Sequence, residues 1–287
     1  MYNGDMFTIT PMNQQIVLEA GKIYEGSITI INSTDATKDF NYRVSVAPYN
    51  VTDEDYTADL ETMYGRSDIV NWIKIPKKTG TLEPGESTEV DFVVNVPESA
   101  SSGGQYAVIL VSSDEEATSN NSFAVSNIYE MGSIIYANVA GDIIHDVEVV
   151  ENYIPGFSFV LPVTVSATLK NNGNTHETAK IALKISDVFS GQVVYPETGE
   201  SGSLEEVIMP ESMRYATRDI NNISPIGIYN VEQSISYLGE VSTFRQTLIV
   251  CPAWFLILSI LTISTLVTVI IRLIFKHKSK KRAVKAI

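Results

Sequence analysis

The residues of this chain that could do chemistry are few and widely spaced. Two histidines, His145 and His176, precede the long apolar segment near the C-terminus, and the only cysteine, Cys251, begins that segment. Neither histidine has a second metal-type ligand two or four residues further on. A nucleophile–histidine–acid set or a zinc site needs such partners. We therefore expect no catalytic residue, no metal and no cofactor, and we expect that the protein is not an enzyme.

Two acidic clusters offer the remaining candidate ligands. The first comprises Asp53, Glu54, Asp55, Asp59 and Glu61, and the second spans residues 114–116. Carboxylates at alternate positions can bind Ca²⁺, but the first cluster lacks the glycine and the terminal glutamate of an EF-hand loop. Solvated loop charge is the preferred interpretation. Calcium binding and an extracellular hydrolase that uses loop 53–61 stay open as alternatives.

Three aromatic residues are the candidates for contact with a ligand. Segment 53–67 is the longest stretch without β alternation, and it contains Tyr56 and Tyr64. Long loops on a β scaffold often carry binding surfaces, although this one could instead fold over the edge of the core. Trp72, in a strand-like run, is either a platform for stacking a sugar ring or a core residue. The core role is preferred.

Period-two alternation of apolar and polar residues dominates the first 250 positions. Such alternation is typical of antiparallel strands with one buried and one solvated face. The clearest faces are Val90, Phe92, Val94 and Val96; Val163, Val165, Ala167 and Leu169; and Ala179, Ile181, Leu183 and Ile185. No stretch before Cys251 sustains a helical period. The pattern predicts an all-β fold.

Turn residues separate these runs at intervals typical of a β-sandwich. Residues 83–86 place Pro and Gly as a type II turn requires, and residues 171–174 (Asn-Asn-Gly-Asn) predict a hairpin loop between the two best strands of the second half. We expect two tandem immunoglobulin-like sandwiches, at residues 1–140 and 141–250, each with about seven strands. The strand-like boundary segment 134–150 suggests a short, stiff joint.

The segment from Cys251 to Ile271 contains no charge, and seven basic residues and no acidic residue follow it. About 20 apolar residues of helix span a bilayer, so we expect a transmembrane helix at residues 251–275. Positive flanks stay in the cytoplasm. The basic tail, residues 276–287, is therefore expected inside and residues 1–250 outside, in a single-pass protein of the cell membrane. Residues 1–20 show no signal-peptide pattern, so an export signal is expected upstream or already removed.

The charge of the outer part limits its partners. The whole chain has a formal charge of −14, and residues 1–250 carry 13 basic against 34 acidic residues, a formal charge of −21. Such a surface disfavours nucleic acid and favours basic protein partners. The same residues contain no cysteine, so their stability must come from packed cores.

A family resemblance rests on the order of several short motifs. In the first half these are residues 7–11 (Phe-Thr-Ile-Thr-Pro), 18–22 (Leu-Glu-Ala-Gly-Lys), 82–86 (Leu-Glu-Pro-Gly-Glu), 94–97 (Val-Asn-Val-Pro) and 103–108 (Gly-Gly-Gln-Tyr-Ala-Val). In the second half they are residues 169–176, 209–214 and 227–229, followed by the apolar segment and the lysine-rich tail. This order resembles the WxL-interacting protein family of Gram-positive surface proteins. The resemblance implies that the first domain binds peptidoglycan and that the second binds a partner protein, with no individual residue assigned.

The sequence therefore predicts a bacterial, membrane-anchored cell-surface adhesion or scaffold protein. Its outer part would contact peptidoglycan or a protein associated with the cell wall, with Tyr56, Tyr64 and Trp72 as candidate contacts. One alternative is a structural stalk, or an accessory subunit of a membrane complex, with no ligand of its own. The second alternative is the hydrolase named above.

Overall fold

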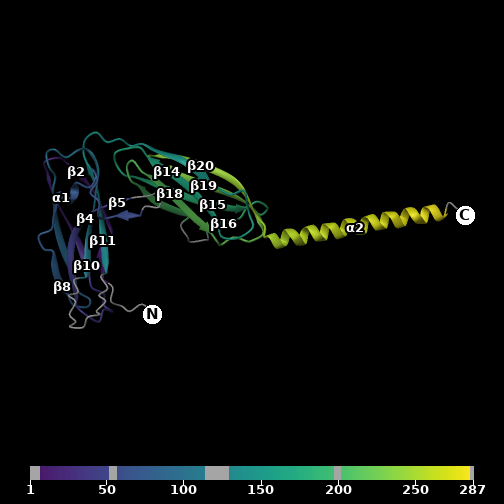
Figure 1. The fold of residues 1–287 in the computed structure, drawn as a ribbon, viewed down its shortest axis with the longest axis horizontal. Helices are drawn as coiled ribbons and strands as arrows, with labels where there is room; N and C mark the ends of the chain where they lie inside the picture. The colour runs from purple at the N-terminus through teal and green to yellow at the C-terminus, as the bar shows by residue number, and fades with distance from the viewer. Residues whose placement is uncertain (1–6, 52–56, 114–128, 197–201, 285–287) are drawn as a thin grey trace. The chain divides into compact units, whose positions relative to one another are not determined.

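A computed structural model describes residues 7–51, 57–113, 129–196 and 202–284, with side chains up to residue 274. The chain is mostly β, as predicted, and one long helix follows the strands (Figure 1). It divides into two compact units. Unit 1 comprises Met1–Val150, Thr168–Thr178 and Val207–Tyr215, and unit 2 comprises Glu151–Ala167, Ala179–Glu206 and Ala216–Ile287. Because both units are discontinuous in sequence, the division into tandem sandwiches at residue 140 stays a prediction.

Unit 1 contains two principal sheets that enclose its core. One has the order β1-β3-β9-β7 and the other the order β2-β11-β10-β4-β8; strands β5 and β6 form a separate pair. The strands are β1 (Thr8–Thr10), β2 (Asn13–Leu18), β3 (Ile23–Ile31), β4 (Phe40–Pro48), β5 (Asn50–Val51), β6 (Ala58–Asp59), β7 (Ile73–Lys74), β8 (Thr79–Leu82), β9 (Ser87–Asn95), β10 (Gly103–Ser113) and β11 (Glu130–Val139). Core residues come from both sheets, so the unit is a β-sandwich.

Strand β9 shows how the sequence builds this sandwich. Val90, Phe92 and Val94 are buried, whereas Asp91 between them is exposed, as the alternation predicts. The turn before β9 is also as predicted: the amide of Glu86 donates to the carbonyl of Glu83 over 3.0 Å. The φ of Gly85 is 82°, which a type II turn requires and which glycine adopts without strain. This turn carries the chain from one sheet to the other.

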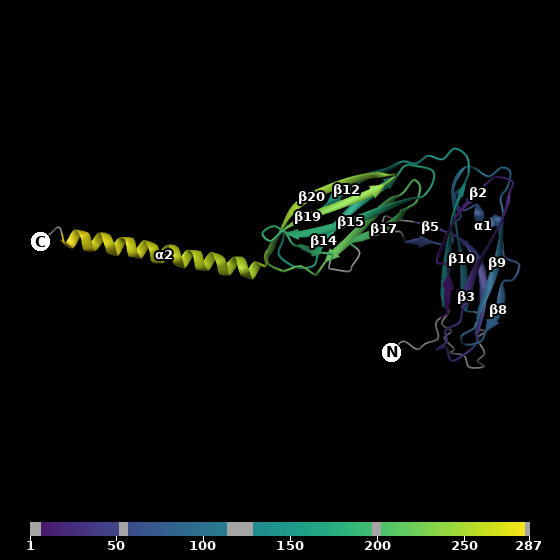
Figure 2. The same cartoon turned by 180° about the vertical axis from the view of Figure 1, so that it is seen from behind.

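A six-stranded sheet that faces a three-stranded one forms most of unit 2, although one end of β12, β14, β15, β17 and β18 belongs to unit 1. The larger has the order β13-β20-β19-β15-β16, with β17 also paired to β15, and the smaller has the order β12-β14-β18 (Figure 2). The strands are β12 (Val147–Tyr153), β13 (Phe157–Ser158), β14 (Val163–Asn171), β15 (Glu177–Asp187), β16 (Val193–Tyr195), β17 (Ser203–Ile208), β18 (Met213–Ile220), β19 (Gly227–Tyr237) and β20 (Glu240–Val250). Its core includes Val163 and Val165 from one sheet and Leu183, Val231 and Leu248 from the other.

The predicted hairpin at residues 171–174 is wrong. Strands β14 and β15 lie in different sheets, so this loop crosses between sheets instead of joining paired neighbours. The side chain of Asn171 shapes it: the amide Nδ2 donates to the carbonyls of Thr175 and Ile208 over 2.8 and 2.9 Å, and Oδ1 accepts from the amide of Gly173 over 2.8 Å. Asn-Gly chemistry specifies a tight turn, but it does not specify that the flanking strands pair.

Two further expectations need correction. A four-residue helix, α1 (Ile69–Trp72), stands where the sequence suggested a strand, and it is too short to produce a helical period. Residues 140–146 lie in no strand, so the boundary segment 134–150 is not continuous β structure. Trp72, the last residue of α1, is 8% exposed and belongs to the core of unit 1.

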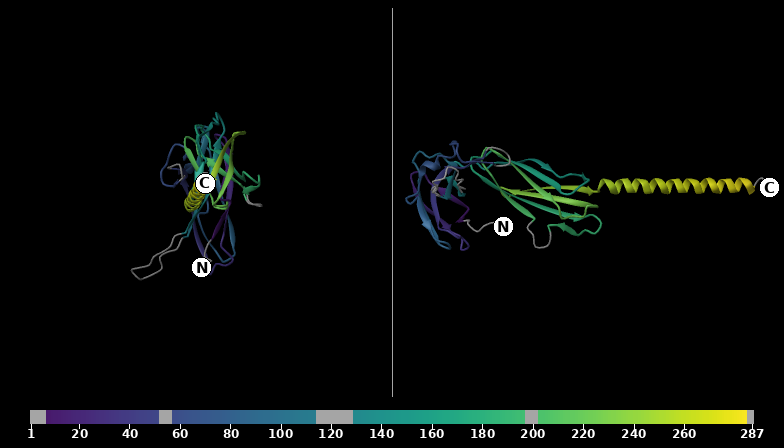
Figure 3. Two further views of the ribbon diagram at one scale, coloured as in Figure 1. Left: turned by 90° about the vertical axis from the view of Figure 1, so that its right-hand side faces the viewer. Right: turned by 60° about the horizontal axis from the view of Figure 1, so that its bottom comes forward.

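The C-terminal helix α2 (Ala253–Val284) is continuous (Figure 3). Its first 22 residues, Ala253–Ile274, are long and apolar enough to cross a membrane by length and composition. Pro252 lies directly before the helix, and its carbonyl accepts the amide of Phe255 over 3.0 Å. Only Cys251 and Pro252 separate α2 from β20.

Core packing in unit 2 gives a direct test of this fold. Val165 is 2% exposed in the centre of β14. Val165→Asp should therefore lower the free energy of unfolding by several kcal/mol, because it buries an unpaired charge. Val241→Asp is the matched control, since Val241 is 63% exposed. Denaturant titration of the full chain in detergent, followed by circular dichroism, measures both. Equal stabilities of the two variants would contradict the assignment of Val165 to the core.

Candidate functional site

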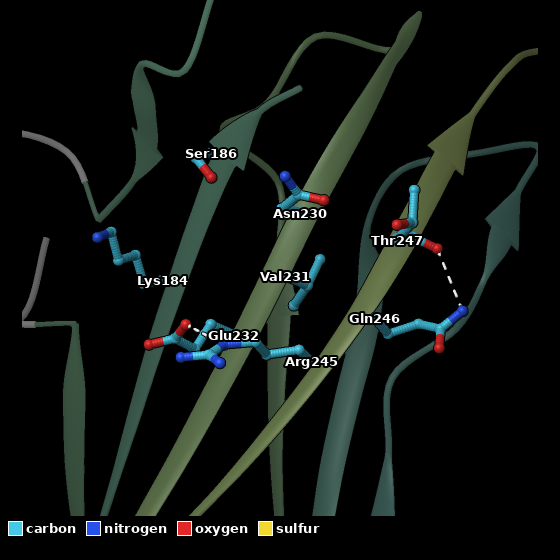
Figure 4. Close-up of a pocket in the computed structure, with 8 residues that line it drawn as sticks. All are labelled: Lys184, Ser186, Asn230, Val231, Glu232, Arg245, Gln246 and Thr247. Carbon is cyan, nitrogen blue, oxygen red and sulfur yellow. Dashed lines mark hydrogen bonds and ion pairs between the residues drawn. The ribbon is translucent and has the colours of Figure 1, made fainter. Parts of the chain in front are cut away.

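A groove of about 610 Å³ lies on the six-stranded sheet of unit 2. Strands β15, β19 and β20 supply all of its lining, as Figure 4 shows. The lining residues are Lys184, Ser186, Asn230, Val231, Glu232, Arg245, Gln246 and Thr247. Seven of the eight are polar or charged, so the groove suits a polar or charged segment better than an apolar ligand.

The register of the three strands brings the charged residues into one row. Lys184 on β15 lies opposite Glu232 on β19, which lies opposite Arg245 on β20. The Arg245 Nε donates to the Glu232 carboxylate over 2.6 Å (Figure 4). This row holds two cations and one carboxylate, whereas the chain as a whole has an excess of acidic residues. The formal charge of this row is therefore +1, opposite in sign to that of the whole chain.

One edge of β20 is open over most of its length. All eleven residues of β20 pair with β19, but on the other side only Ile249 and Val250 have strand partners, in β13. The amide of Ile249 donates to Gly156 over 3.0 Å, and the amide of Cys251 donates to Ser158 over 3.0 Å. In the described part of the chain, no strand pairs with residues 240–248 on this side.

The direction of the open backbone groups follows from this pairing. In an antiparallel pair, successive residues point their N–H and C=O groups alternately toward and away from the partner strand. The register of β19 and β20 has no bulge. Since Ile249 points away from β19, Val241, Thr243, Arg245 and Thr247 do so as well. The side-chain Nε2 of Gln246 donates to the Thr247 carbonyl over 3.3 Å (Figure 4). Among the described residues, no strand pairs with the outward groups of Val241, Thr243 and Arg245.

The β19–β20 hairpin fixes which residues face outward. Its two-residue turn, Leu238 and Gly239, has φ angles of 48° and 79°. Positive φ at both central positions is typical of a type I′ turn, whose twist matches that of paired strands. The turn makes Tyr237 pair with Glu240. From Glu240 onward, every second residue therefore directs its backbone N–H and C=O groups toward β19, and the residues between them direct theirs toward the open edge.

Unit 1 contains a second pocket, of about 600 Å³, with Arg66 at its wall. The Arg66 guanidinium donates to the carbonyl of Asn174 over 2.9 Å and to the Glu211 carboxylate over 2.7 Å. The Arg66 carbonyl accepts the amide of Tyr106 over 2.8 Å. Tyr64 also lines this pocket. Arg66 thus fixes loops distant in sequence and leaves a polar cavity between them.

An aromatic cluster lies behind this pocket. The His176 ring lies 5.7 Å from the ring of Tyr106 and 5.1 Å from that of Tyr136, measured between centroids. The Tyr106 hydroxyl accepts the amide of His176 over 2.8 Å. Burial lowers the pKa of His176 and raises the pKa of Tyr106, because it disfavours the charged form of each group. Both side chains are therefore neutral at neutral pH and act as packing residues.

The predicted contact residues do not form one site. Tyr56 lies outside the described residues. Tyr64 is 54% exposed and lines the pocket of unit 1. Trp72 is packed in the core, which corrects the idea of a sugar platform, because a buried ring has no free face for stacking.

The acidic clusters are described only in part. Residues 53–55 and 114–116 lie outside the described residues. Asp59 turns its carboxylate toward its own loop and accepts the amides of Glu61 and Thr62, each over 3.0 Å. These hydrogen bonds lower the pKa of Asp59. Among the described residues, no three metal-ligating side chains come together.

Sequence reasoning missed the groove and the open edge. The groove residues are up to 63 positions apart and meet only through strand register. The sequence did carry one usable signal. The Leu-Gly pair between two alternating runs, at residues 227–237 and 240–250, predicts a long terminal hairpin, and its second strand leads directly into the apolar segment.

No family model and no curated protein matches this chain. Among solved structures it is similar to the class 5 fimbriae chaperone CfaA, at 9% identity over 85% of this chain and 99% of that chain, with a TM-score of 0.41. It is similar to the E. coli chaperone DraB, at 13% identity over 85% and 97% of the two chains, with a TM-score of 0.39. It also matches a chain of the Acinetobacter baumannii CsuC–CsuE chaperone–tip adhesion subunit complex, at 14% identity over 85% and 99%, with a TM-score of 0.40. Similarity at this level reveals nothing of a ligand or a partner.

The neutral, buried His176 predicts a pH dependence of stability. In the unfolded chain a histidine has a pKa of about 6.5, and folding lowers the pKa of His176. At a pH between the two pKa values, His176 therefore binds a proton in the unfolded chain but not in the folded chain. Stability should be fully present above about pH 6.5 and should fall as the pH decreases below that value.

Denaturant titration of the full chain at several pH values measures this effect. His176→Asn should reduce the loss of stability at low pH. His145→Asn is the control, because His145 is exposed and pairs with Glu177 at 2.5 Å; this variant should retain the loss that depends on His176. Identical pH profiles for the wild type and His176→Asn would contradict the assignment.

Proposed function

We propose that this chain is a membrane-anchored binding protein that holds an extended segment of a partner protein along the open edge of β20. The supporting observation is the outward row of Val241, Thr243 and Arg245, whose backbone groups have no strand partner among the described residues. An extended segment that adds to such an edge gains main-chain hydrogen bonds, and its alternate side chains provide specificity.

The form of this edge supports binding over protection. Proteins usually protect edge strands with proline, inward-facing charges, bulges or very short strands. Residues 240–248 contain no proline, and the register with β19 is regular. The one charged side chain within the open row, Arg245, is paired with Glu232 on the groove side. Within this stretch the Gln246 side chain occupies the outward carbonyl of Thr247, and no described strand pairs with the outward groups of Val241, Thr243 and Arg245.

The groove suggests the chemistry of the partner. Arg245 is next to the open edge, and Lys184 lies at the far side of the same row. An added strand would place alternate side chains beside Thr243, Arg245 and Thr247. A carboxylate opposite Arg245 would share that cation with Glu232, as charge-assisted hydrogen bonds favour. The binding segment is therefore an extended peptide with an acidic residue at that position.

Anchoring and sidedness are further parts of the proposal. Helix α2 is long enough to span a bilayer, and the basic residues after it favour a cytoplasmic tail. The strands would then face outward, as a cell-surface protein requires. Labelling of the tail lysines by a membrane-impermeant amine reagent in intact cells would contradict this orientation.

Peptidoglycan binding is the second candidate. The observation that favours it is the polar pocket of unit 1, lined by Tyr64, Arg66 and Gln105, whose volume is in the usual range for a small ligand. This candidate accords with what the resemblance to the WxL-interacting family implies. Co-sedimentation of the full chain with purified peptidoglycan, compared with a Tyr64→Ser variant, distinguishes it from the strand-addition site in unit 2.

A proline substitution tests the strand-addition site. Thr243→Pro removes an outward N–H that β19 does not use, so the hairpin should keep its fold. Strand addition should be lost, because the added strand loses a hydrogen-bond donor and meets the proline ring. Thr243→Val is the matched control, since it removes the hydroxyl but keeps the N–H. The measurement is capture of surface proteins by the full chain in detergent.

The expected result is capture by the wild type and by Thr243→Val, and its loss in Thr243→Pro. Equal capture by all three proteins would exclude the edge of β20 as the site. If the wild type captures no surface protein and no peptidoglycan at low salt, the protein is a structural stalk instead.

A further inference from the structure

Unit 2 carries a concentration of exposed apolar side chains at one end of its sheets. The members are Phe157 (42% exposed), Phe159 (52%), Val160 (67%), Val188 (41%), Phe189 (82%) and Ile226 (40%). Single exposed apolar residues are ordinary on protein surfaces, but these six come from only three segments, the first of which contains the short strand β13. Contiguous exposed apolar surface marks a site of contact with a protein or a membrane.

Strand register places the three loops at the same end. Phe157 pairs with Ile249, and Gly227 pairs with Val250, so the loops before β14 and before β19 lie beside the last residues of β20. The amide of Val188 donates to the carbonyl of Ile228 over 2.9 Å, which brings the loop after β15 to the same end. From this end β20 runs into α2 (Figure 1).

The loops are also free of charge. Residues 154–162, 188–192 and 221–226 contain no Asp, Glu, Lys, Arg or His, although 19% of the chain is charged. The opposite end of the β19–β20 hairpin differs, because Glu240 adjoins the turn. A charge-free rim suits a surface that enters the interface of a bilayer, where a buried charge would be costly.

Local hydrogen bonds hold the aromatic residues outward. The Asp187 carboxylate accepts the amides of Phe189 and Ser190 over 3.0 and 2.7 Å, so its charge is turned toward its own loop and Phe189 is presented at the tip. The rings of Phe157 and Phe159 contact each other edge to face, with centroids 4.7 Å apart. Trp254, 62% exposed in the first turn of α2, is an aromatic residue of the kind that favours membrane interfaces.

We infer that these three loops form an interfacial collar that rests in the outer surface of the lipid bilayer around the start of α2. The inference depends on the proposed membrane anchoring, since α2 must span the bilayer for the collar to meet lipid. It adds a second lipid contact that restrains the membrane-proximal end of unit 2. The partner is the lipid surface itself; a protein partner for the collar is an outcome of the test.

Fluorescence quenching by spin-labelled lipids tests the collar. Each variant carries Cys251→Ser, which removes the only thiol, and one new cysteine labelled with an environment-sensitive fluorophore. Phe189→Cys and Phe159→Cys probe two loops of the collar. Leu238→Cys, 42% exposed in the hairpin at the other end of β19 and β20, is the matched control. The full chain is reconstituted in phosphatidylcholine vesicles that contain lipid with a doxyl group near the headgroup, and flotation shows whether α2 is anchored.

The collar predicts quenching and a blue shift at positions 159 and 189, and neither at position 238. If the protein floats with the vesicles but positions 159 and 189 respond like position 238, the collar is wrong and the anchor stands. In that case the apolar loops face a protein or solvent. If the protein does not float with the vesicles, both the collar and the proposed anchor are wrong.

Discussion

Pairing of backbone hydrogen-bonding groups is the constraint on which this structure depends. A buried N–H or C=O without a partner costs free energy comparable to a lost hydrogen bond, and in lipid the cost is greater. Helix α2 meets the constraint alone, because its bonds are internal. In the sheets, the backbone groups pair with those of neighbouring strands, and the groups at the edges of each sheet have no strand to pair with. Strand β20 connects the sheet to the helix: one of its sides pairs with β19, and its end leads within two residues into α2.

Because β20 leads directly into α2, the open edge and the proposed membrane anchor lie in one continuous segment of the chain. Pairing with β19 holds β20 along its full length, and β13 holds only its last two residues. The free part of the edge begins at the β19–β20 hairpin and ends just before the apolar loops. A partner segment that adds to this edge would therefore lie beside the strand that leads into α2. In the proposed function, the charged groove beside the edge would supply selectivity that main-chain pairing alone lacks.

The sequence predicts the local structure well and the long-range pairing poorly. Alternation identifies β9 and β15, and Pro-Gly chemistry identifies the turn at Gly85, because these features depend on near neighbours in sequence. The apolar segment identifies α2 for the same reason. The choice of sheet for β14 and β15 depends instead on packing. Alternation predicts that Ser166 and Thr168 of β14 lie on the solvated face of the strand, but both are buried. Residue type and sequence context single out Tyr64 and Trp72 as candidates, but only the structure shows that Tyr64 lines a pocket and that Trp72 lies in the core.

Backbone amide hydrogen exchange on the full chain in a lipid nanodisc tests the open edge most directly. Before any partner is added, the amides of Val241, Thr243 and Arg245 should exchange fast, and those of Ser242, Phe244 and Gln246 should be protected by pairing with β19. Addition of a surface-protein extract that contains the partner should protect the first set and leave the second unchanged. Equal protection of all six amides in the free protein would show that the edge is already paired, and it would contradict the account.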